Sequence, residues 1–260
     1  MKADRTIIDR FADLGVELNG LIIPGASVDA VLGRHAFNLF VHNDHDLYKV
    51  SLIGSATAIR YRKREFLLTT QHQLRGVDLP NVAMMTDTGS HVITSAGSRH
   101  FEPRSDTDAY DITAFEFTEP CAAYPELKRR FFNLRRVPND VLNIDVIGFL
   151  LTGFPSKAQA YEIADKNHIG VGRLAVVCTL EPQPNDPALL CVKAVSPLDL
   201  DPDGMSGGSA FVIQMQDGRP QAFFAGIIIR GGLEHFYVLK SGFVRAFLDA
   251  CLERSVESGR

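Results

Sequence analysis

A glycine-rich segment towards the C-terminus contains the residue best suited to act as a nucleophile. The segment reads DGMSGGS over residues 203–209 and is followed by the apolar run 210–213. The small neighbours of Ser206 let a substrate backbone approach closely, and Gly204 is able to adopt the φ values that an outward-pointing amide needs. The amides of Gly204 and Ser206 are therefore the predicted oxyanion hole. A hydroxyl alone is a weak nucleophile, so the prediction requires a histidine base and an orienting carboxylate.

Candidates for both partners lie upstream of this segment. His72 follows the run EFLLTTQ at residues 65–71, in which an apolar strand delivers an imidazole to a loop. Asp111 opens the alternating run DITAFEF. Asp106 and Asp108 lie just before Asp111 and are rivals for the orienting role.

Three sequence blocks resemble those of a known enzyme family. LLTTQH, DITAFEF and GMSGGSAFV are similar to the TAAH, DIALL and GDSGGP blocks of trypsin-like (chymotrypsin-fold) serine peptidases. The order His72, Asp111, Ser206 is also that family's order and differs from that of subtilisin and the α/β-hydrolases. The resemblance covers roughly residues 45–250 and points to a bacterial, non-secreted type. It implies that Ser206 attacks a peptide carbonyl, that His72 transfers the proton, and that Asp111 orients the imidazole.

The residue before the serine departs from the family pattern. Pancreatic-type members carry an acidic residue there, which pairs with a newly cut N-terminus, whereas this chain has Met205 and no IVGG-like cleavage site. Activation by proteolytic trimming is therefore not expected. The hypothesis for control is the ordering of loops by a regulatory protein partner, as in an effector of a stress or phage-defence system.

The resemblance also indicates where the floor of the substrate pocket lies. Counting back six residues from Ser206 reaches Leu200, where members with a basic preference place a carboxylate. Leu200 implies an apolar pocket floor. Asp199 and Asp201 flank it, and a one-residue shift of the loop would restore an acid at this position.

The predicted wall of this pocket is the run GIIIRG at residues 226–231, which resembles the family's GIVSWG. This resemblance assigns Ile229, Arg230 and Gly231 to the substrate pocket. Arg230 is suited to neutralise a nearby carboxylate or to attract an acidic substrate. No cleavage preference is predicted.

The composition is that of an ordinary globular protein. The chain has 260 residues, of which 45% are hydrophobic and 22% charged, and a formal net charge of −4. This balance gives no sign of a nucleic-acid or anionic-membrane surface, and no apolar run approaches the roughly 20 residues that span a bilayer. The expected partner is a protein or peptide substrate, with no nucleic acid and no membrane. The first residues carry charges where a signal peptide needs an apolar core.

The cysteines favour free thiols and a cytoplasmic location. Secreted members of the resembled family place a cysteine beside the catalytic histidine, whereas Gln73 follows His72 here. The four cysteines are scattered without C-x-x-C spacing, at Cys121, Cys178, Cys191 and Cys251.

One segment has the residue types of a metal site, namely HNDHD at residues 42–46. H-x-x-H alone is a weak pattern, and no third ligand is predicted nearby. A polar loop is therefore expected, with neither a metal nor another cofactor.

The predicted fold is all-β, with two six-stranded antiparallel β-barrels of the chymotrypsin/trypsin type, an N-terminal helical segment and a C-terminal helix. The expected divisions are an N-terminal helical extension (1–44), a first barrel with His72 and Asp111 (45–135), and a second barrel with Ser206 and the C-terminal helix (136–260).

Apolar spacing predicts the three helices. Residues 3–14 place their apolar side chains on one helical face, and a second short helix follows Ser27. The third begins near Ser241 and carries an apolar stripe.

These observations predict a serine endopeptidase that acts through an acyl-enzyme. The alternative is a catalytically silent protein of the same fold that serves as a binding module or scaffold. The complete set of His72, Asp111 and Ser206 argues against silence, because a pseudoenzyme is free to lose any of the three. An esterase or other acyl hydrolase that uses the same residues is a third hypothesis.

Overall fold

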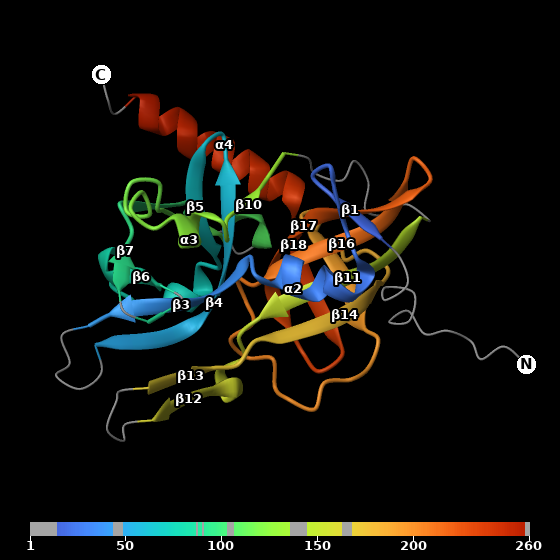
Figure 1. The fold of residues 1–260 in the computed structure, drawn as a ribbon, viewed down its shortest axis with the longest axis horizontal. Coiled ribbons are helices and arrows are strands. Elements are labelled where there is room, and N and C mark those ends of the chain that lie inside the picture. Colours follow the sequence, from blue (N-terminus) through green and yellow to red (C-terminus); the bar gives the residue numbers. More distant parts are fainter. Residues whose placement is uncertain are drawn as a thin grey trace, which may run out of the picture.

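The chain folds into two β-units side by side, with one long helix (Figure 1). The structure is a computed structural model that describes residues 15–43, 49–86, 88–89, 91–102, 107–135, 145–162 and 168–257. The helix expected over 3–14 lies outside the described residues. So do Asp106 and most of the HNDHD segment.

The first unit is a curled, mainly antiparallel sheet. Its strands are β3 (Ala36–His42), β4 (Val50–Tyr61), β5 (Arg64–Thr69), β6 (Val82–Met85), β7 (Val92–Thr94), β8 (Gly97–His100), β9 (Thr113–Glu116) and the short β10 (Phe132–Asn133). They pair in the order β7-β6-β3-β4-β5-β9-β8, with β10 parallel to β4. The end strands β7 and β8 are consecutive in the chain. Between them, the amides of Ser95 and Ala96 donate to Val82 in β6 (3.2 Å) and Glu116 in β9 (2.8 Å), which draws the two ends together.

This sheet begins earlier in the chain than the sequence analysis expected. β3 lies inside the range 1–44 that was assigned to a helical extension. It pairs with β4 on one side and β6 on the other. The run AFNLFVH at residues 36–42 contains two phenylalanines and a valine, which suit a strand buried between two neighbours.

The second unit is a closed barrel. Its strands are β11 (Val146–Gly153), β14 (Leu174–Leu180), β15 (Leu189–Ala194), β16 (Ser209–Gln216), β17 (Arg219–Gly231) and β18 (His235–Lys240). They pair in the order β16-β11-β14-β15-β18-β17, and pairing of β16 with β17 closes the ring. The hairpin between these two strands turns at Asp217 and Gly218. Both residues have positive φ (53° and 75°), as a two-residue hairpin turn requires.

Shorter elements surround the two units. A hairpin of β1 (Val16–Leu18) and β2 (Leu21–Ile23) extends the second sheet, because β1 pairs in parallel with β17. A helix, α2 (Val28–Gly33), follows Ser27 as predicted, although the Ser27 side chain makes no capping hydrogen bond. The remaining elements are α3 (Pro125–Lys128) and a separate hairpin of β12 (Gln159–Glu162) and β13 (His168–Val171).

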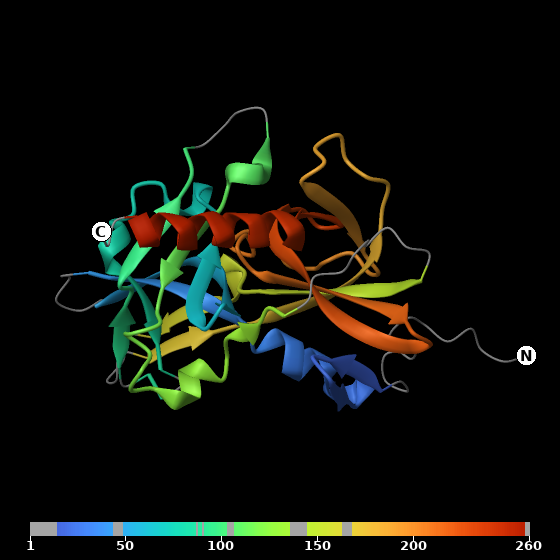
Figure 2. The ribbon, with the colours of Figure 1, turned by 90° about the horizontal axis from the view of Figure 1, so that it is seen from above.

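The predicted C-terminal helix is α4 (Ser241–Glu257), which spans both β-units (Figure 2). Its buried side chains join a core formed by strands of both units. The ring of Phe247 packs edge-on against Phe101 at 5.2 Å. On the first unit, Asp249 accepts a hydrogen bond from the Tyr61 hydroxyl and pairs with Arg62, both at 2.9 Å. The helix therefore ties the two units together.

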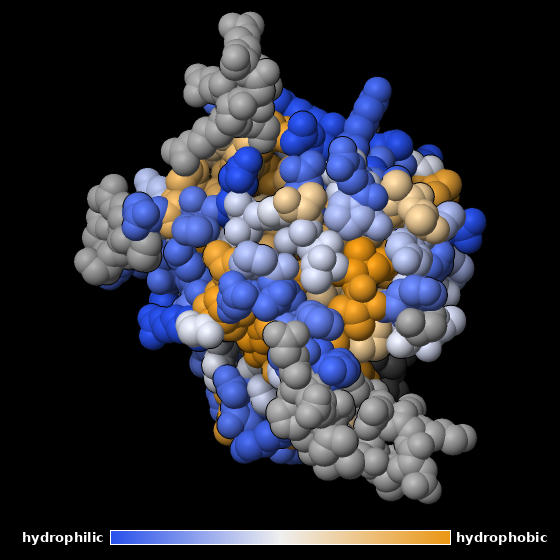
Figure 3. Space-filling model, turned by 90° about the vertical axis from the view of Figure 1, so that its left-hand side faces the viewer, coloured by the Kyte–Doolittle hydropathy of each residue, from blue (hydrophilic) through white to orange (hydrophobic). Residues whose placement is uncertain are grey.

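The surface of the first unit mixes residue types. Figure 3 shows hydrophobic residues in separate areas among hydrophilic ones on this face. In the described part of the chain, no helix is both long and apolar enough to cross a membrane.

Aromatic rings fill the space between the two units. Phe132 of the first unit packs edge-on against Phe211 of the second at 5.1 Å, and Phe211 packs against Phe224 at 5.7 Å. His35 lies in the same cluster, with its ring 5.2 Å from that of Phe132. Its Nδ1–H donates to the carbonyl of Arg130 at 2.6 Å, which fixes the orientation of the ring.

Burial of His35 makes the stability of the fold dependent on pH. The side chain is 2% exposed, and burial lowers the pKa of His35 from 6.5 to about 4. The unfolded chain therefore binds this proton more readily than the native state. Stability due to His35 is complete above pH 6.5 and decreases by roughly 3 kcal/mol as the pH falls towards 4.

We expect urea unfolding of His35→Gln to depend less on pH between 4 and 6.5 than unfolding of the wild type. The matched control is His235→Gln, since His235 lies on the surface and should keep the wild-type pH dependence. Equal pH slopes for wild type and His35→Gln would contradict the assignment.

Candidate active site

Strand pairing brings His72 and Asp111 together. His72 begins a 3₁₀ turn, η2 (His72–Leu74), just after β5, and Asp111 lies just before β9. β5 and β9 are paired neighbours, with Thr69 opposite Thr113. Two residues separated by 39 positions in sequence are thus placed at the same end of adjacent strands.

The two side chains make a two-point contact. The backbone amide of His72 donates to Asp111 Oδ1 at 3.0 Å, and His72 Nδ1 lies 2.7 Å from Asp111 Oδ2. A carboxylate at this position holds the proton on Nδ1 and leaves Nε2 free to accept another. Asp111 is the more enclosed of the two side chains, at 20% exposure against 38% for His72. The imidazole is therefore oriented and open to the solvent side.

The rival carboxylate Asp108 has other partners. The Asp108 carboxylate pairs with the guanidinium of Arg230, and the backbone amide of Asp108 donates to Asp186 Oδ2 at 2.9 Å. Asp186 also accepts from the Thr107 hydroxyl at 2.8 Å and the Ala188 amide at 2.8 Å. Burial raises the pKa of Asp186, but these hydrogen bonds and the charge of Arg230 outweigh burial and lower it overall. This network attaches the loop before Asp111 to the second unit.

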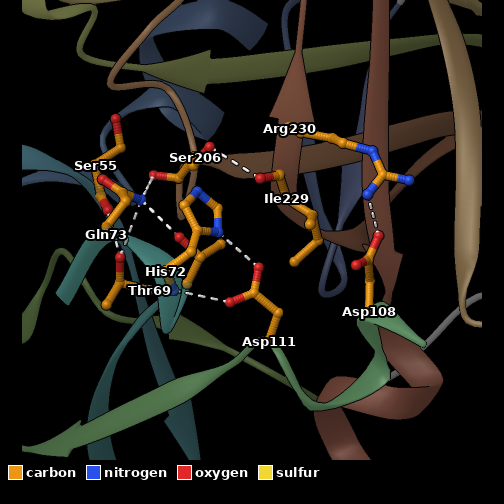
Figure 4. Close-up of polar contacts among 10 residues, drawn as sticks. Ser55, Thr69, His72, Gln73, Asp108, Asp111, Ser206, Ile229 and Arg230 are labelled. Atoms are coloured by element: carbon orange, nitrogen blue, oxygen red, sulfur yellow. Dashed lines mark hydrogen bonds and ion pairs between the residues drawn. The ribbon is translucent and has the colours of Figure 1, made fainter. Parts of the chain in front are cut away.

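Ser206 lies beside His72 at the junction of the two units. In Figure 4 the His72 ring lies between the carboxylate of Asp111 and the side chain of Ser206. The Ser206 hydroxyl donates to the carbonyl of Ile229 at 2.9 Å. A hydroxyl has a single hydrogen to donate, so in this arrangement it is not directed at His72.

Hydrogen bonds fix the two amides predicted to form the oxyanion hole. The carbonyl of Asp203 accepts from the Ser156 amide at 2.7 Å, and the carbonyl of Met205 accepts from the Gly208 amide at 2.9 Å. In a trans peptide the following N–H points away from the carbonyl, so these bonds orient the amides of Gly204 and Ser206. Neither amide donates to another group in the described residues. Gly204 has φ +93°, a conformation that favours glycine.

Donors from the first unit hold the carbonyls of this loop. The Ser55 hydroxyl donates to Gly204 at 2.6 Å, and the Thr57 hydroxyl donates to Gly207 at 2.8 Å. Neither hydroxyl was predicted from the sequence as part of the site. Their signal in the sequence is a pair of hydroxyls at alternate positions within the apolar stretch of strand β4, where both are fully buried.

Gln73 completes this set of contacts. Its Nε2 donates to the carbonyl of Ser206 and to the Thr70 hydroxyl, the latter at 2.9 Å. Its Oε1 is buried without a partner. The residue after His72 thus joins the histidine turn to the serine loop by hydrogen bonds, at the position where secreted members of the resembled family carry a cysteine.

Two of the four predicted pocket residues line a cleft beside His72. The cleft measures about 590 Å³, and its walls include Ile229 and Arg230 together with Leu74 and Val77. The guanidinium of Arg230 also lies over the ring of Tyr237, at 4.7 Å. The other two predicted pocket residues, Leu200 and Gly231, are not part of this lining.

The cysteines are unsuited to act as nucleophiles. All four are free and buried. Burial raises the pKa of Cys121 and of Cys178 to about 12, so both thiols stay protonated at neutral pH. Within the described ranges, no group of three or more histidine, cysteine, aspartate or glutamate side chains is placed to hold a metal ion.

Comparison with known proteins shows the fold of this chain. No protein-family model and no curated sequence matches it. Human heparin binding protein has a similar structure, with a TM-score of 0.56 and 11% identity over 86% of this chain and 93% of that one. An inactivated protease paralogue of the scabies mite gives a TM-score of 0.55 and 10% identity over 85% of this chain and 92% of that one. The predicted chymotrypsin-like two-barrel fold is thereby confirmed.

We expect Gly204→Ala to disable the loop, with reaction of Ser206 towards an acylating probe falling at least 100-fold. An added Cβ would lie 2.8 Å from the Ser156 amide nitrogen and 3.0 Å from the Phe154 carbonyl, at a φ that alanine disfavours. The matched control is Gly218→Ala, which has a similar φ of +75° but open space around it. Wild-type reactivity in Gly204→Ala would contradict this role.

We also expect Gln73→Met to slow acylation of Ser206 by about tenfold, because it removes the donor to the Ser206 carbonyl while keeping the side-chain length. The rate of probe labelling measures the effect. Gln216→Met, in the hairpin of β16 and β17, is the control and should label at the wild-type rate. If the two variants label equally fast, the contact of Gln73 does not position the loop.

Proposed function

We propose that this protein is a serine endopeptidase that hydrolyses peptide bonds through an acyl-enzyme on Ser206. The observation that carries the proposal is the two-point contact between His72 and Asp111, next to a serine in a loop with two oriented amides. A structural histidine has no need of a carboxylate on one ring nitrogen and a nucleophile near the other. The combination is what general-base activation of a hydroxyl requires.

Each residue of the site has its own role in the proposed reaction. His72 Nε2 takes the proton from the Ser206 hydroxyl as its oxygen attacks the carbonyl of the substrate. The amides of Gly204 and Ser206 stabilise the negative charge on the carbonyl oxygen, and Asp111 stabilises the imidazolium. The imidazolium then protonates the leaving amine. Water, activated by His72, hydrolyses the acyl-enzyme.

Control of this activity by a regulatory protein partner is part of the proposal. Its support is the hydrogen bond from Ser206 to Ile229, which uses the hydrogen that His72 must accept. Rotation about the Cα–Cβ bond of Ser206 redirects the hydroxyl. We place the enzyme in the cytoplasm, as an effector of stress or phage defence, and four free thiols are in keeping with a reducing compartment.

The second candidate function is that of a silent binding module. It is favoured by the likeness to the mite paralogue, which is an inactivated protease. The contact between His72 and Asp111 favours the enzyme, since a binding module gains nothing from an oriented imidazole. An esterase would use the same residues and is distinguished by its failure to cleave peptides.

Reaction with a fluorophosphonate probe tests the proposal. We expect the wild type to be labelled at Ser206, and Ser206→Ala and His72→Ala to show no labelling. Asp111→Asn should slow labelling by about 10⁴, because the imidazole then loses its orientation and its counter-charge. Mass spectrometry of the labelled peptide identifies the serine.

The matched control is Ser209→Ala, three residues along the same segment. Ser209 is fully buried and its hydroxyl has no partner, so its loss should leave labelling unchanged. Absence of labelling in the purified protein and in extracts of stressed cells would favour the silent module. Full activity of the isolated chain would exclude control by a partner.

A further inference from the structure

We infer that the enzyme proposed above accepts only a small residue, such as glycine, alanine or serine, at the position whose carbonyl is attacked. The reason is that Phe236 occupies the space that would hold a larger side chain. The inference rests on the proposed function and concerns the substrate class of the same site.

The segment from Ile229 to Gly231 marks where the substrate residue must lie. The Ile229 carbonyl is 2.9 Å from the Ser206 hydroxyl, and the two residues that follow, Arg230 and Gly231, are exposed. An extended peptide that adds to this end of β17 places the residue bearing the attacked carbonyl next to Ser206. The side chain of that residue then points at the space between the serine loop and the β17–β18 hairpin.

Phe236 fills this space from the neighbouring strand. In the β17–β18 ladder Gly231 lies directly opposite Phe236. A Cβ added at Gly231 would lie only 2.3 Å from Cδ1 and 2.5 Å from Cε1 of Phe236, so the ring lies against the glycine backbone. The Phe236 side chain is 0% exposed. The absence of a side chain at position 231 therefore accommodates the ring and leaves no opening for a ligand.

Apolar side chains also fill the space beside the Ser206 loop, around Phe236. Phe236 belongs to a buried cluster that includes Met205, Ala194 and Val238, with Leu198 packed against it. Met205 is the residue immediately before Ser206 and is 1% exposed. Leu200, which the sequence assigned to the pocket floor, is half-buried and lies outside this cluster. In this inference Phe236, and not Leu200, supplies the apolar floor and takes up its volume.

A short turn closes the outer side of this space. The amide of Gly232 donates to the carbonyl of His235 at 2.8 Å, so the connection from β17 to β18 is tight. The carbonyls of Leu233 and Glu234 accept from the amides of Leu198 (3.0 Å) and Ala194 (2.7 Å). These bonds hold the turn on the loop after β15. A large side chain would have to displace a buried ring and break this contact.

Acylation by activated esters tests the inference on the wild type. The substrates are p-nitrophenyl esters of N-acetylated glycine, alanine, phenylalanine and lysine, and the burst of nitrophenol gives the acylation rate. We expect the alanine and glycine esters to acylate Ser206 at least 100-fold faster than the other two. A phenylalanine or lysine ester that reacts as fast as the alanine ester would overturn the inference.

Variants at Phe236 assign the preference to this ring. Phe236→Ala should raise the rate for the phenylalanine ester relative to the alanine ester at least tenfold, and Phe236→Leu, which keeps more of the buried volume, should do so to a lesser extent. The matched control is Phe223→Leu, in the same buried cluster, which should leave the ratio unchanged. An unchanged ratio in a folded Phe236→Leu would overturn the role of the ring.

The fluorophosphonate probe, which carries no amino-acid side chain, separates failure of the inference from failure of the proposed function. Labelling together with equal or reversed ester rates overturns the inference and leaves the serine hydrolase in place. Labelling without acylation by any ester also overturns it, since a small side chain would then not be accepted either. Absence of both labelling and acylation, in the purified protein and in extracts of stressed cells, overturns the proposed function and the inference with it.

Discussion

The site depends on hydrogen bonds by which one β-unit holds the backbone of the other. Ser55, Thr57 and Gln73 of the first unit donate to three carbonyls in the Ser206 loop of the second. Each buried carbonyl left without its donor would cost about 1–3 kcal/mol, so the loop is stable in this conformation only when the two units are in register. The distance between Ser206 and His72 is therefore set by the interface and not by either unit alone.

The rest of the structure stabilises this register by non-covalent means. The rings of Phe132 and Phe211 pack across the interface, and α4 contacts both units through Phe247 and Asp249. All four cysteines are free. In secreted members of the resembled family, a cysteine follows the histidine and can form a disulfide within the same unit. Here Gln73 stands at that position and joins the histidine turn to the Ser206 loop of the other unit. A hydrogen-bonded connection of this kind adjusts to small movements, whereas a disulfide restricts them.

The sequence predicted the parts of the site that are encoded locally. His72, Asp111 and the Ser206 loop each lie in a short block next to a strand, and a local pattern is enough to find them. The hydroxyls of Ser55 and Thr57 were missed because their partners are about 150 residues away and depend on how two sheets meet. Phe236 was missed for a related reason, since its place opposite Gly231 follows from the register of a hairpin. β3 was missed because the N-terminal range was read for helical periodicity alone.

If the protein is the proposed peptidase, the inferred filled pocket changes which contacts must supply the binding energy for a substrate. Burial of apolar surface contributes about 25 cal/mol of binding free energy per Å². A small side chain next to the attacked carbonyl buries little such surface and so contributes little affinity. The remaining affinity has to come from backbone pairing along β17 and from the cleft of about 590 Å³ whose walls include Leu74, Val77 and Arg230. Both require an extended segment several residues long. An enzyme built in this way selects substrates by an exposed, extended stretch of chain more than by one side chain, and folded proteins rarely offer such a stretch.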